Sequence, residues 1–282
     1  KTISNLKLSE QGTRYLEKAN KNILIDLKNK KIKKLKNYIW VTKKNLEYLL
    51  KKKNLLNMDT ISVLSSSIKK NTIDIPINKK STLIDNLNIF KKKFKIKKKK
   101  VLFSNLSSWK IFKDKIIDTK KSFFSIIFLK IKTNSREVNN WSQPIISDHY
   151  ISFNGFLIKS KNKTNHYLLK IIQEPGLSLP KFTSTIAIKN YNPKINKYDI
   201  KFLNFFKNKN DTIKFINSDE GGRFYKNETH NLIYVLKDNE KINLSKKFMW
   251  VSHNQVIDLI SKNLITIEAR NLFASFNIDK VN

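Results

Sequence analysis

The chain has 282 residues and carries 57 Lys and Arg against 22 Asp and Glu, a formal net charge of +35. Hydrophobic residues make up 40% of it, enough to build the core of one large domain or two smaller ones. Cysteine is absent, which excludes a disulfide framework, a thiolate zinc site and a cysteine nucleophile. The longest apolar run is too short to span a bilayer and no secretory signal is visible, so we expect a cytoplasmic protein without a membrane span.

Residues 1–72 form the first of three predicted segments. A short strand is expected at 22–27, and an amphipathic helix at 43–53, where leucines recur at helical spacing. A second short helix is expected at 58–68, with acidic and hydroxyl side chains near its start. The chain starts with Lys1 rather than Met, and we expect it to be a fragment or a processed product.

Residues 73–104 are predicted to form a polar, basic connector that includes the run KKKFKIKKKK at 91–100. Only four of the 57 basic residues of the chain are arginines, and the abundant Lys, Asn and Ile have A/T-rich codons. Proteins selected to bind phosphates usually combine arginine with lysine. We therefore favour a solvated lysine surface with no specific nucleic-acid partner, and binding to nucleic acid or an anionic membrane is the alternative.

Residues 105–282 are predicted to form a second, complete unit of α+β class, with a mixed or antiparallel sheet followed by short helices. A buried strand is expected at 122–131, because this stretch is rich in Phe and Ile. A break is expected at Glu174-Pro175-Gly176, where proline and glycine interrupt a strand. The other expected elements are strands at 166–173, 182–188 and 232–236, and helices at 253–262 and 268–276.

One seven-residue motif occurs twice, as SEQGTRY at 9–15 and as SDEGGRF at 218–224. Ser9 and Ser218 lie 209 positions apart, and the tryptophans that follow, Trp40 and Trp250, lie 210 positions apart. A match of residue type, order and spacing indicates a tandem duplication. Only eight residues precede the first copy, so we expect the first repeat to be truncated.

The second copy of the motif combines groups that could bind a ligand or transfer protons. Its glycines, Gly221 and Gly222, allow close approach of the backbone, and Arg223 can bind a diphosphate with two parallel hydrogen bonds. Glu220 could act as a base if burial raises its pKa. The alternative is a tight turn held by a Glu–Arg ion pair.

Two further segments carry candidate functional groups. Glu174 lies at a predicted strand end, and a plain turn carboxylate is the alternative there. Trp141 offers an indole for stacking and Gln143 an amide for hydrogen bonds, although a tryptophan seen alone is more often a core residue. The four histidines have no metal-binding spacing, and neither a glycine-rich phosphate loop nor a dinucleotide fingerprint is present.

Together these segments resemble the NDP-hexose 2,3-dehydratase family, whose members act on dTDP-4-keto-6-deoxyglucose. The second half supplies, in the family's order, Trp141-Ser142-Gln143-Pro144, Glu174-Pro175-Gly176, Ser184-Thr185-Ile186, residues 218–224, Trp250 and Glu268-Ala269-Arg270. The first half supplies only residues 9–15, Trp40 and residues 57–60. The sequence departs from the family pattern at Ser184, where proline is usual, and at Thr266, where asparagine is usual.

The resemblance implies a tandem Nudix-like α+β fold, a homodimer and sugar-nucleotide pockets in the repeats. The Nudix hydrolase box is not in this sequence, which argues against metal-dependent diphosphate hydrolysis. The chemistry implied is loss of water across C2 and C3 of a 4-keto sugar, with no metal or redox cofactor required. A partner 3-ketoreductase would consume the 3,4-diketo product.

The same resemblance, together with residue type, suggests roles for individual side chains. Glu174 and Glu220 are the acid/base candidates, with Glu220 as the base, and Arg223 would contact phosphate or the enolate. The candidates for binding the sugar nucleotide are Trp141, Gln143, Thr185, Ser218, Gly221, Gly222, Asn231, Arg270 and Arg14. Two other functions stay open: a non-catalytic or degenerate sugar-nucleotide-binding protein, and a basic nucleic-acid-binding protein.

Overall fold

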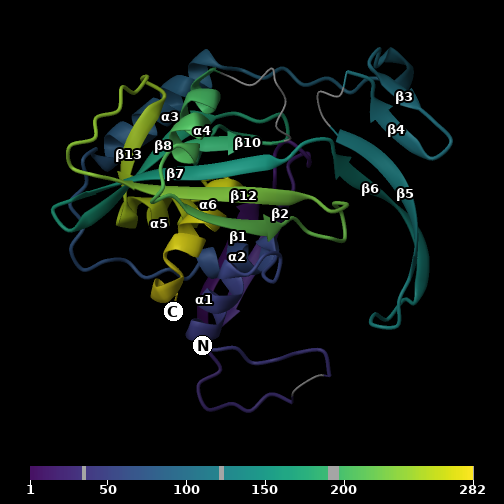
Figure 1. Cartoon of the computed structure of the whole chain (residues 1–282), viewed down its shortest axis with the longest axis horizontal. Helices are drawn as coiled ribbons and strands as arrows, with labels where there is room; N and C mark the ends of the chain where they lie inside the picture. Colours follow the sequence, from purple (N-terminus) through teal and green to yellow (C-terminus); the bar gives the residue numbers. More distant parts are fainter. Residues whose placement is uncertain (34–35, 121–123, 190–196, 282) are drawn as a thin grey trace.

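The computed structural model describes residues 1–33, 36–120, 124–189 and 197–281 as a mixed α+β fold (Figure 1). Its helices are α1 (Lys43–Lys51), α2 (Met58–Ser65), α3 (Lys80–Lys93), α4 (Lys197–Lys207), α5 (His253–Ser261) and α6 (Ile267–Phe276). Two 3-10 turns are η1 (Phe103–Asn105) and η2 (Ile278–Lys280). The strands are β1 (Thr2–Ser9), β2 (Ala19–Ile25), β3 (Trp109–Ile111), β4 (Lys115–Asp118), β5 (Phe124–Lys132), β6 (Asn140–Asp148), β7 (Ser152–Lys161), β8 (Thr164–Ile172), β9 (Lys181–Thr183), β10 (Ile186–Ile188), β11 (Ile213–Ser218), β12 (Glu228–Leu236) and β13 (Phe248–Ser252).

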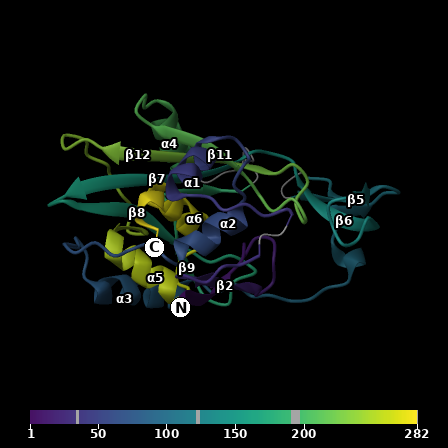
Figure 2. The ribbon, with the colours of Figure 1, turned by 90° about the horizontal axis from the view of Figure 1, so that it is seen from below.

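The largest sheet has the strand order β11-β12-β7-β8-β13, with β10 paired to β7 and β9 paired to β8. β12 and β7 run parallel, whereas the other pairs in this sheet are antiparallel. An antiparallel pair, β1–β2, stands beside it, and a separate antiparallel sheet has the order β3-β4-β5-β6. The long, curved β5–β6 pair lies at one side of the molecule in Figures 1 and 2.

Both faces of the large sheet carry buried apolar side chains. Successive side chains along a strand point to opposite faces, so neighbouring residues enter different clusters. On β7, Phe156 and Ile158 join one apolar cluster with residues of α5 and α6, whereas Leu157 joins a second cluster with residues of α4. Figure 2 shows α4 on the opposite side of the β7–β8 pair from α5 and α6. The sheet is therefore the central layer between helices.

The prediction is confirmed for the most strongly patterned elements. The expected helices correspond to α1, α2, α5 and α6, and the expected strands at 22–27, 166–173 and 232–236 correspond to β2, β8 and β12. The expected strand at 182–188 is divided into β9 and β10. The structure also contains β1, β6, β7, β13 and α4, which the sequence analysis did not predict.

One segment contains more regular structure than its polar sequence indicates, and one expectation is corrected. The segment 73–104, predicted as a polar, basic connector, contains helix α3, whose Leu83 and Leu87 are buried in the core. The strand expected to be buried at 122–131 is β5, but Phe128 is 51% exposed and Ser125 is the only fully buried residue among its described positions. Residues 122 and 123 of that expected strand lie outside the described residues.

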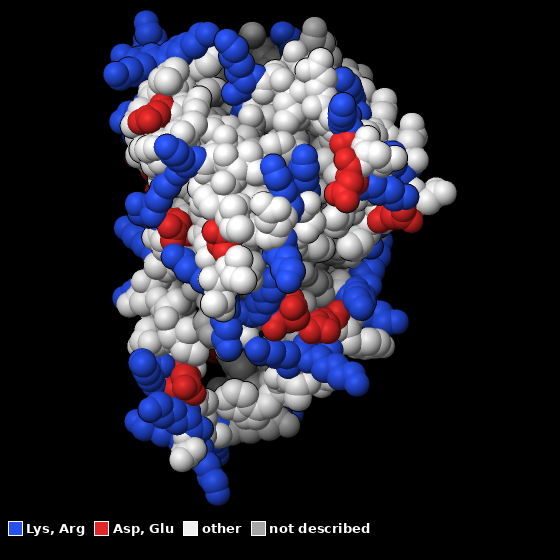
Figure 3. Space-filling model, turned by 90° about the vertical axis from the view of Figure 1, so that its left-hand side faces the viewer, with Lys and Arg blue, Asp and Glu red and all other residues white. Residues whose placement is uncertain are grey.

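Basic side chains are scattered over the face of the molecule in Figure 3. Asp and Glu occur among these Lys and Arg residues. No helix among the described residues is long and apolar enough to cross a membrane.

Candidate functional site

Both copies of the repeated motif form the same turn. The first copy connects β1 to β2 and the second connects β11 to β12, in each case within an antiparallel hairpin. The backbone N–H of Tyr15 donates to the carbonyl of Gln11 at 3.0 Å, and the N–H of Phe224 donates to the carbonyl of Glu220 at 3.0 Å. These pairs are 209 positions apart, so the spacing of the repeat is matched by its local structure.

The second copy contacts the Trp141–Pro144 segment on β6. The side-chain amide of Gln143 donates to the carbonyl of Gly222 at 2.8 Å, and the indole of Trp141 donates to Gln143 Oε1 at 2.7 Å. Ile146, further along β6, forms a parallel bridge with Phe224. The structure therefore brings together two segments that the sequence places about eighty residues apart.

The first copy contacts the Glu174–Gly176 segment that follows β8. The N–H of Gly176 donates to the carbonyl of Gly12 at 2.7 Å, and the N–H of Glu17 donates to the carbonyl of Gly176 at 2.7 Å. A Cβ atom on Gly176 would lie 1.8 Å from the Tyr15 carbonyl oxygen. This contact thus requires glycine at position 176.

A buried charge cluster lies beside this junction and combines Glu174 with Glu268, Lys189, Asp219 and Arg14. Lys189 Nζ is 3.3 Å from Glu268 Oε1, and the two side chains are 11% and 4% exposed. Arg14 forms a buried ion pair with Asp148 at the end of β6. Carboxylates outnumber cations here, so the cluster favours retention of a proton.

The pKa values in the cluster follow from burial and from the excess of carboxylates. Burial, and next the charge of Glu268, raise the pKa of Glu174 to about 8. Burial also raises the pKa of the Asp219 carboxyl. Burial opposes the charge on Lys189, but Glu268 and Asp219 outweigh it and raise the pKa of its ammonium group. Near neutral pH the cluster therefore holds a protonated Glu174 beside a charged Lys189.

A small cavity of about 20 Å³ adjoins the cluster and is lined by Lys189, Asp219 and Glu268 together with four asparagines. Asn217 Nδ2, Asn271 Oδ1 and Glu268 Oε2 have no hydrogen-bond partner among the described residues, and Glu268 Oε1 has only its ion pair with Lys189. Unpaired buried polar atoms are costly, so they favour a water molecule or a polar ligand at this position. A space of this size holds one water molecule, and a hexose ring requires the lining side chains to move.

Glu220 and Arg223 belong to a different cluster. Arg223 Nη1 lies 2.8 Å from Glu220 Oε2, with the side chains 38% and 28% exposed. Burial, and next the charge of Asp59, raise the pKa of Glu220. The charged neighbours of Glu174 include Glu268, Lys189 and Arg14, whereas those of Glu220 are Asp59, Arg223 and Lys18. The two acid/base candidates from the sequence therefore face different surroundings.

The other candidate binding residues divide into cavity-lining and structural positions. Asn231 lines the small cavity and donates to Asn217 Oδ1 at 2.9 Å. The Thr185 hydroxyl accepts a hydrogen bond from the Leu157 N–H on β7 and donates one to the Leu168 carbonyl on β8. Thr185 therefore has a structural role between these two strands.

Arg270, Ser218 and Gly221 complete the set. Arg270 is 1% exposed and donates to the Ser9 carbonyl at 2.9 Å and to Ser62 Oγ at 3.1 Å. Ser218 is paired with Glu228 at the end of the β11–β12 hairpin, and Gly221 has open space where a Cβ would be. Arg270 thus holds the first motif copy in place.

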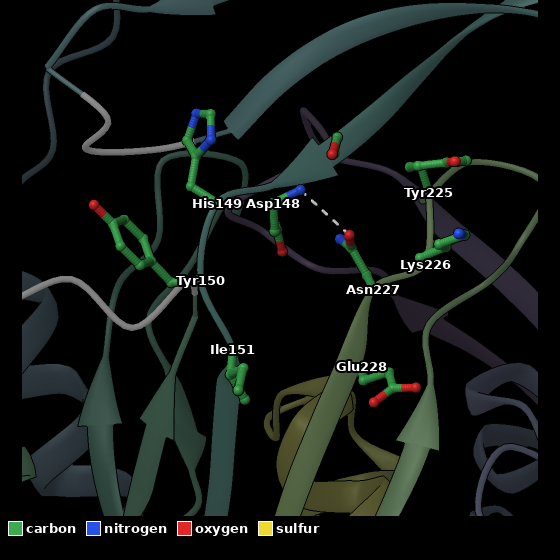
Figure 4. Close-up of a pocket in the computed structure, with 9 residues that line it drawn as sticks. Asp148, His149, Tyr150, Ile151, Tyr225, Lys226, Asn227 and Glu228 are labelled. Atoms are coloured by element: carbon green, nitrogen blue, oxygen red, sulfur yellow. Dashed lines mark hydrogen bonds between the residues drawn. The ribbon is translucent and has the colours of Figure 1, made fainter.

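A larger cavity, of about 360 Å³, lies near the Arg14–Asp148 pair (Figure 4). The chain from Asp148 to Ile151 lines one side, and the segment from Tyr225 to Glu228 before and within β12 lines the other. The backbone N–H of Asp148 donates to Asn227 Oδ1 at 3.2 Å, which joins the two sides. This cavity has enough room for part of a polar ligand next to the charge cluster.

Sequence reasoning did not select Lys189 or Asp219 as functional, and it quoted Glu268 only as part of a family segment. Asp219 directly precedes Glu220 in the motif, and the base role was predicted for Glu220 instead. Lys189 had no signal of its own among 53 lysines. No group of three or more His, Asp or Glu suited to a metal ion occurs among the described residues.

A family model described as NDP-hexose 2,3-dehydratase matches residues 1–66 and 80–276. Three similar proteins are each named dTDP-4-dehydro-6-deoxy-alpha-D-glucopyranose 2,3-dehydratase. The protein from Streptomyces violaceoruber is 25% identical, with 94% of this chain and 63% of that protein covered. The Saccharopolyspora spinosa protein is 25% identical, with 95% of this chain and 61% of that protein covered. The Amycolatopsis orientalis protein is 22% identical, with 98% of this chain and 60% of that protein covered. This chain thus spans about three-fifths of the length of these relatives.

Among solved structures, an Ap4A hydrolase from C. elegans aligns with 47% of this chain and 96% of its own. Its sequence identity is 11% and the TM-score is 0.28.

Proposed function

Because the chain belongs to the NDP-hexose 2,3-dehydratase family, we propose that it removes water across C2 and C3 of dTDP-4-keto-6-deoxyglucose or a related sugar nucleotide. The observation that carries this proposal is the family match over both motif copies and the segments that contact them. The reaction belongs to deoxysugar biosynthesis, and a 3-ketoreductase would take up the product. The chain spans about three-fifths of its relatives, so the activity of this length of protein is part of the proposal.

The reaction needs a base, an acid and a group that holds negative charge. The C4 ketone acidifies the C3 hydrogen, and a base removes it to give an enolate, which requires a cation or hydrogen-bond donors. The electron pair then forms the C2–C3 double bond as the C2 hydroxyl leaves with a proton from a general acid. The resulting C3 enol becomes the ketone of a 3,4-diketo sugar when C2 gains a proton and the C3 hydroxyl loses one. All atoms balance with water as the second product.

The buried charge cluster supplies these three groups. Glu174 keeps its proton near neutral pH and is the general acid for the departing hydroxyl. Glu268 lines the small cavity, its Oε2 has no partner among the described residues, and it is the base. The Lys189 ammonium, which forms an ion pair with Glu268 Oε1, stabilises the enolate. Glu220 is the competing base, because its motif position suggests the role, although its side chain is more exposed than that of Glu268 and is likewise ion-paired.

The test is incubation of the protein with dTDP-4-keto-6-deoxyglucose and trapping of the diketo product with a 3-ketoreductase. Glu174→Gln and Glu268→Gln are expected to lower turnover by about a hundredfold or more, and Glu220→Gln by much less. Full turnover by Glu268→Gln together with loss in Glu220→Gln would transfer the base role to Glu220. Tight dTDP binding without product would favour the non-catalytic alternative, and salt-dependent DNA retention without dTDP affinity the nucleic-acid-binding one.

We further propose that the chain contains two Nudix-like repeats and that it forms a cytoplasmic homodimer. Each motif copy lies in a hairpin and is followed by two helices, α1 and α2 or α5 and α6. The N-caps of α2 and α6, Asn57 and Thr266, lie 209 positions apart, and each accepts a bond from the backbone N–H three residues later. Sedimentation equilibrium tests the dimer, since a monomer at micromolar concentration contradicts it.

A further inference from the structure

A basic groove runs between the first motif copy and the segment that follows helix α3. It has a volume of about 730 Å³, and its walls are residues 12–17 on one side and residues 96–100 on the other, with Pro175 and Gly176. The second wall has the sequence IKKKK. The groove is thus lined by four consecutive lysines opposite a turn that contains Gly12.

One lysine of this wall fixes the segment, and three carry charge that the protein does not neutralise. Lys98 Nζ lies 3.1 Å from Glu17 Oε1 and donates to the Leu177 carbonyl at 3.3 Å. Lys97, Lys99 and Lys100 form no ion pair with any residue in the described part of the chain. Charges of one sign along a groove focus its potential and attract an anion.

The groove lies directly against the acid of the proposed reaction. Gly12 lines the groove, and a Cβ on it would lie 2.7 Å from Glu174 Oε2 and 2.5 Å from Leu177 Cγ, so this wall of the groove contacts the buried carboxyl group. In a sugar nucleotide the pyrophosphate is bonded to the sugar. A pyrophosphate held in the groove therefore places its sugar close to Glu174.

We propose that Lys97, Lys99 and Lys100 bind the pyrophosphate of the sugar nucleotide in this groove. This assignment rests on the proposed function for the identity of the substrate. The ammonium groups act as point charges for the two phosphates. The exposed side chains of Leu16 and Ile96 line the same groove and give apolar contact to the rest of the nucleotide.

The test compares two triple variants with the same change in charge. Lys97→Gln/Lys99→Gln/Lys100→Gln removes the groove lysines, and Lys91→Gln/Lys92→Gln/Lys93→Gln removes three exposed lysines that do not line it. Binding of dTDP and of inorganic pyrophosphate is measured by calorimetry at fixed ionic strength. We expect the groove variant to bind both about tenfold more weakly, with KM for the sugar nucleotide raised and kcat retained.

The outcomes separate this assignment from the proposed reaction. Equal affinity for dTDP in the groove variant and the wild type overturns the assignment, as does an equal loss in the two triple variants. If the wild type forms no diketo sugar but dTDP binding falls only in the groove variant, the anion site stands and the proposed function fails. If the wild type is active and KM is unchanged in the groove variant, the function stands and the groove assignment fails.

Discussion

Tyr15 and Phe224, which occupy the same position in the two motif copies, pack edge to face with their ring centroids 6.2 Å apart. Contact between equivalent residues is the arrangement expected where two copies meet around a local two-fold axis. The Arg223 guanidinium also lies over the Tyr15 ring, 5.5 Å from its centroid. The repeated motif therefore supplies contacts between the two hairpins as well as a turn in each.

This relationship predicts an energetic coupling between the two rings. Tyr15→Ala and Phe224→Ala each remove the edge-to-face contact, so the double variant should lose about 0.5–1.5 kcal/mol less than the sum of the single losses. Urea unfolding of the four proteins measures this difference. Tyr48, on α1 and 59% exposed, is the control partner, and Tyr48→Ala should show no coupling to Phe224→Ala. Additive effects of Tyr15→Ala and Phe224→Ala would contradict the contact.

The junction between the first motif copy and the Glu174–Gly176 segment predicts a difference between two glycines. Gly176→Ala places a Cβ 1.8 Å from a backbone oxygen, so the loop must move and the free energy of unfolding should fall by about 2 kcal/mol or more. Gly221→Ala meets no atom within 4 Å and should change it by less than about 0.5 kcal/mol. The urea midpoints of Gly176→Ala and Gly221→Ala measure this difference. Equal midpoints would contradict the close contact between Gly176 and the Tyr15 carbonyl.

The buried ion pair between Lys189 and Glu268 predicts a large effect of removing one charge. Lys189→Met leaves Glu268 and Asp219 without their cation in a buried site, which should cost about 3–5 kcal/mol of unfolding free energy. Adding Glu268→Gln to Lys189→Met should recover part of this loss, because the unpaired charge is then removed.

The control for this effect is an exposed ion pair. Lys53 Nζ lies 3.1 Å from Glu228 Oε2, and the lysine is 59% exposed. Lys53→Met should therefore change the free energy of unfolding by less than about 1 kcal/mol. If Lys189→Met cost no more than Lys53→Met, the cluster around Lys189 would be solvated rather than buried.

The sequence predicted the helices whose pattern is local. The leucines of α1 recur at helical spacing, Asp59 and Thr60 lie near the start of α2, and both helices form where these residues indicate. Helix α3 was missed because lysines and asparagines surround its buried Leu83 and Leu87. Strand β5 was assigned to the interior from composition alone, although composition does not specify what covers a strand.

The candidate site could be predicted only in its conspicuous parts. Glu174 was selected from the segment Glu174-Pro175-Gly176, and its high pKa follows from burial near Glu268, almost a hundred residues later. No spacing rule connects these positions, since the large sheet and helix α6 bring them together. Glu220 has the stronger motif, but its partner Arg223 lies in the same turn at a more exposed position.

The raised pKa of Glu174 predicts how stability changes with pH. Its pKa is about 8 in the folded protein against an ordinary 4.5, so between pH 5 and 7 the folded state holds a proton that the unfolded state lacks. The contribution of Glu174 to stability is thus complete below pH 4.5 and is lost as the pH rises through 8. Between these pH values the ionisation of Glu174 lowers the free energy of unfolding by up to ~1.4 kcal/mol per pH unit.

The variant Glu174→Gln tests this pH dependence. Its side chain cannot ionise, so its unfolding free energy should fall less steeply with pH than that of the wild type. Urea unfolding at pH 5, 6 and 7 measures both slopes, with Glu137→Gln as the exposed control. Parallel slopes for Glu174→Gln and the wild type would mean that Glu174 is ionised in the folded protein, and the proposal that it is the general acid would then fail.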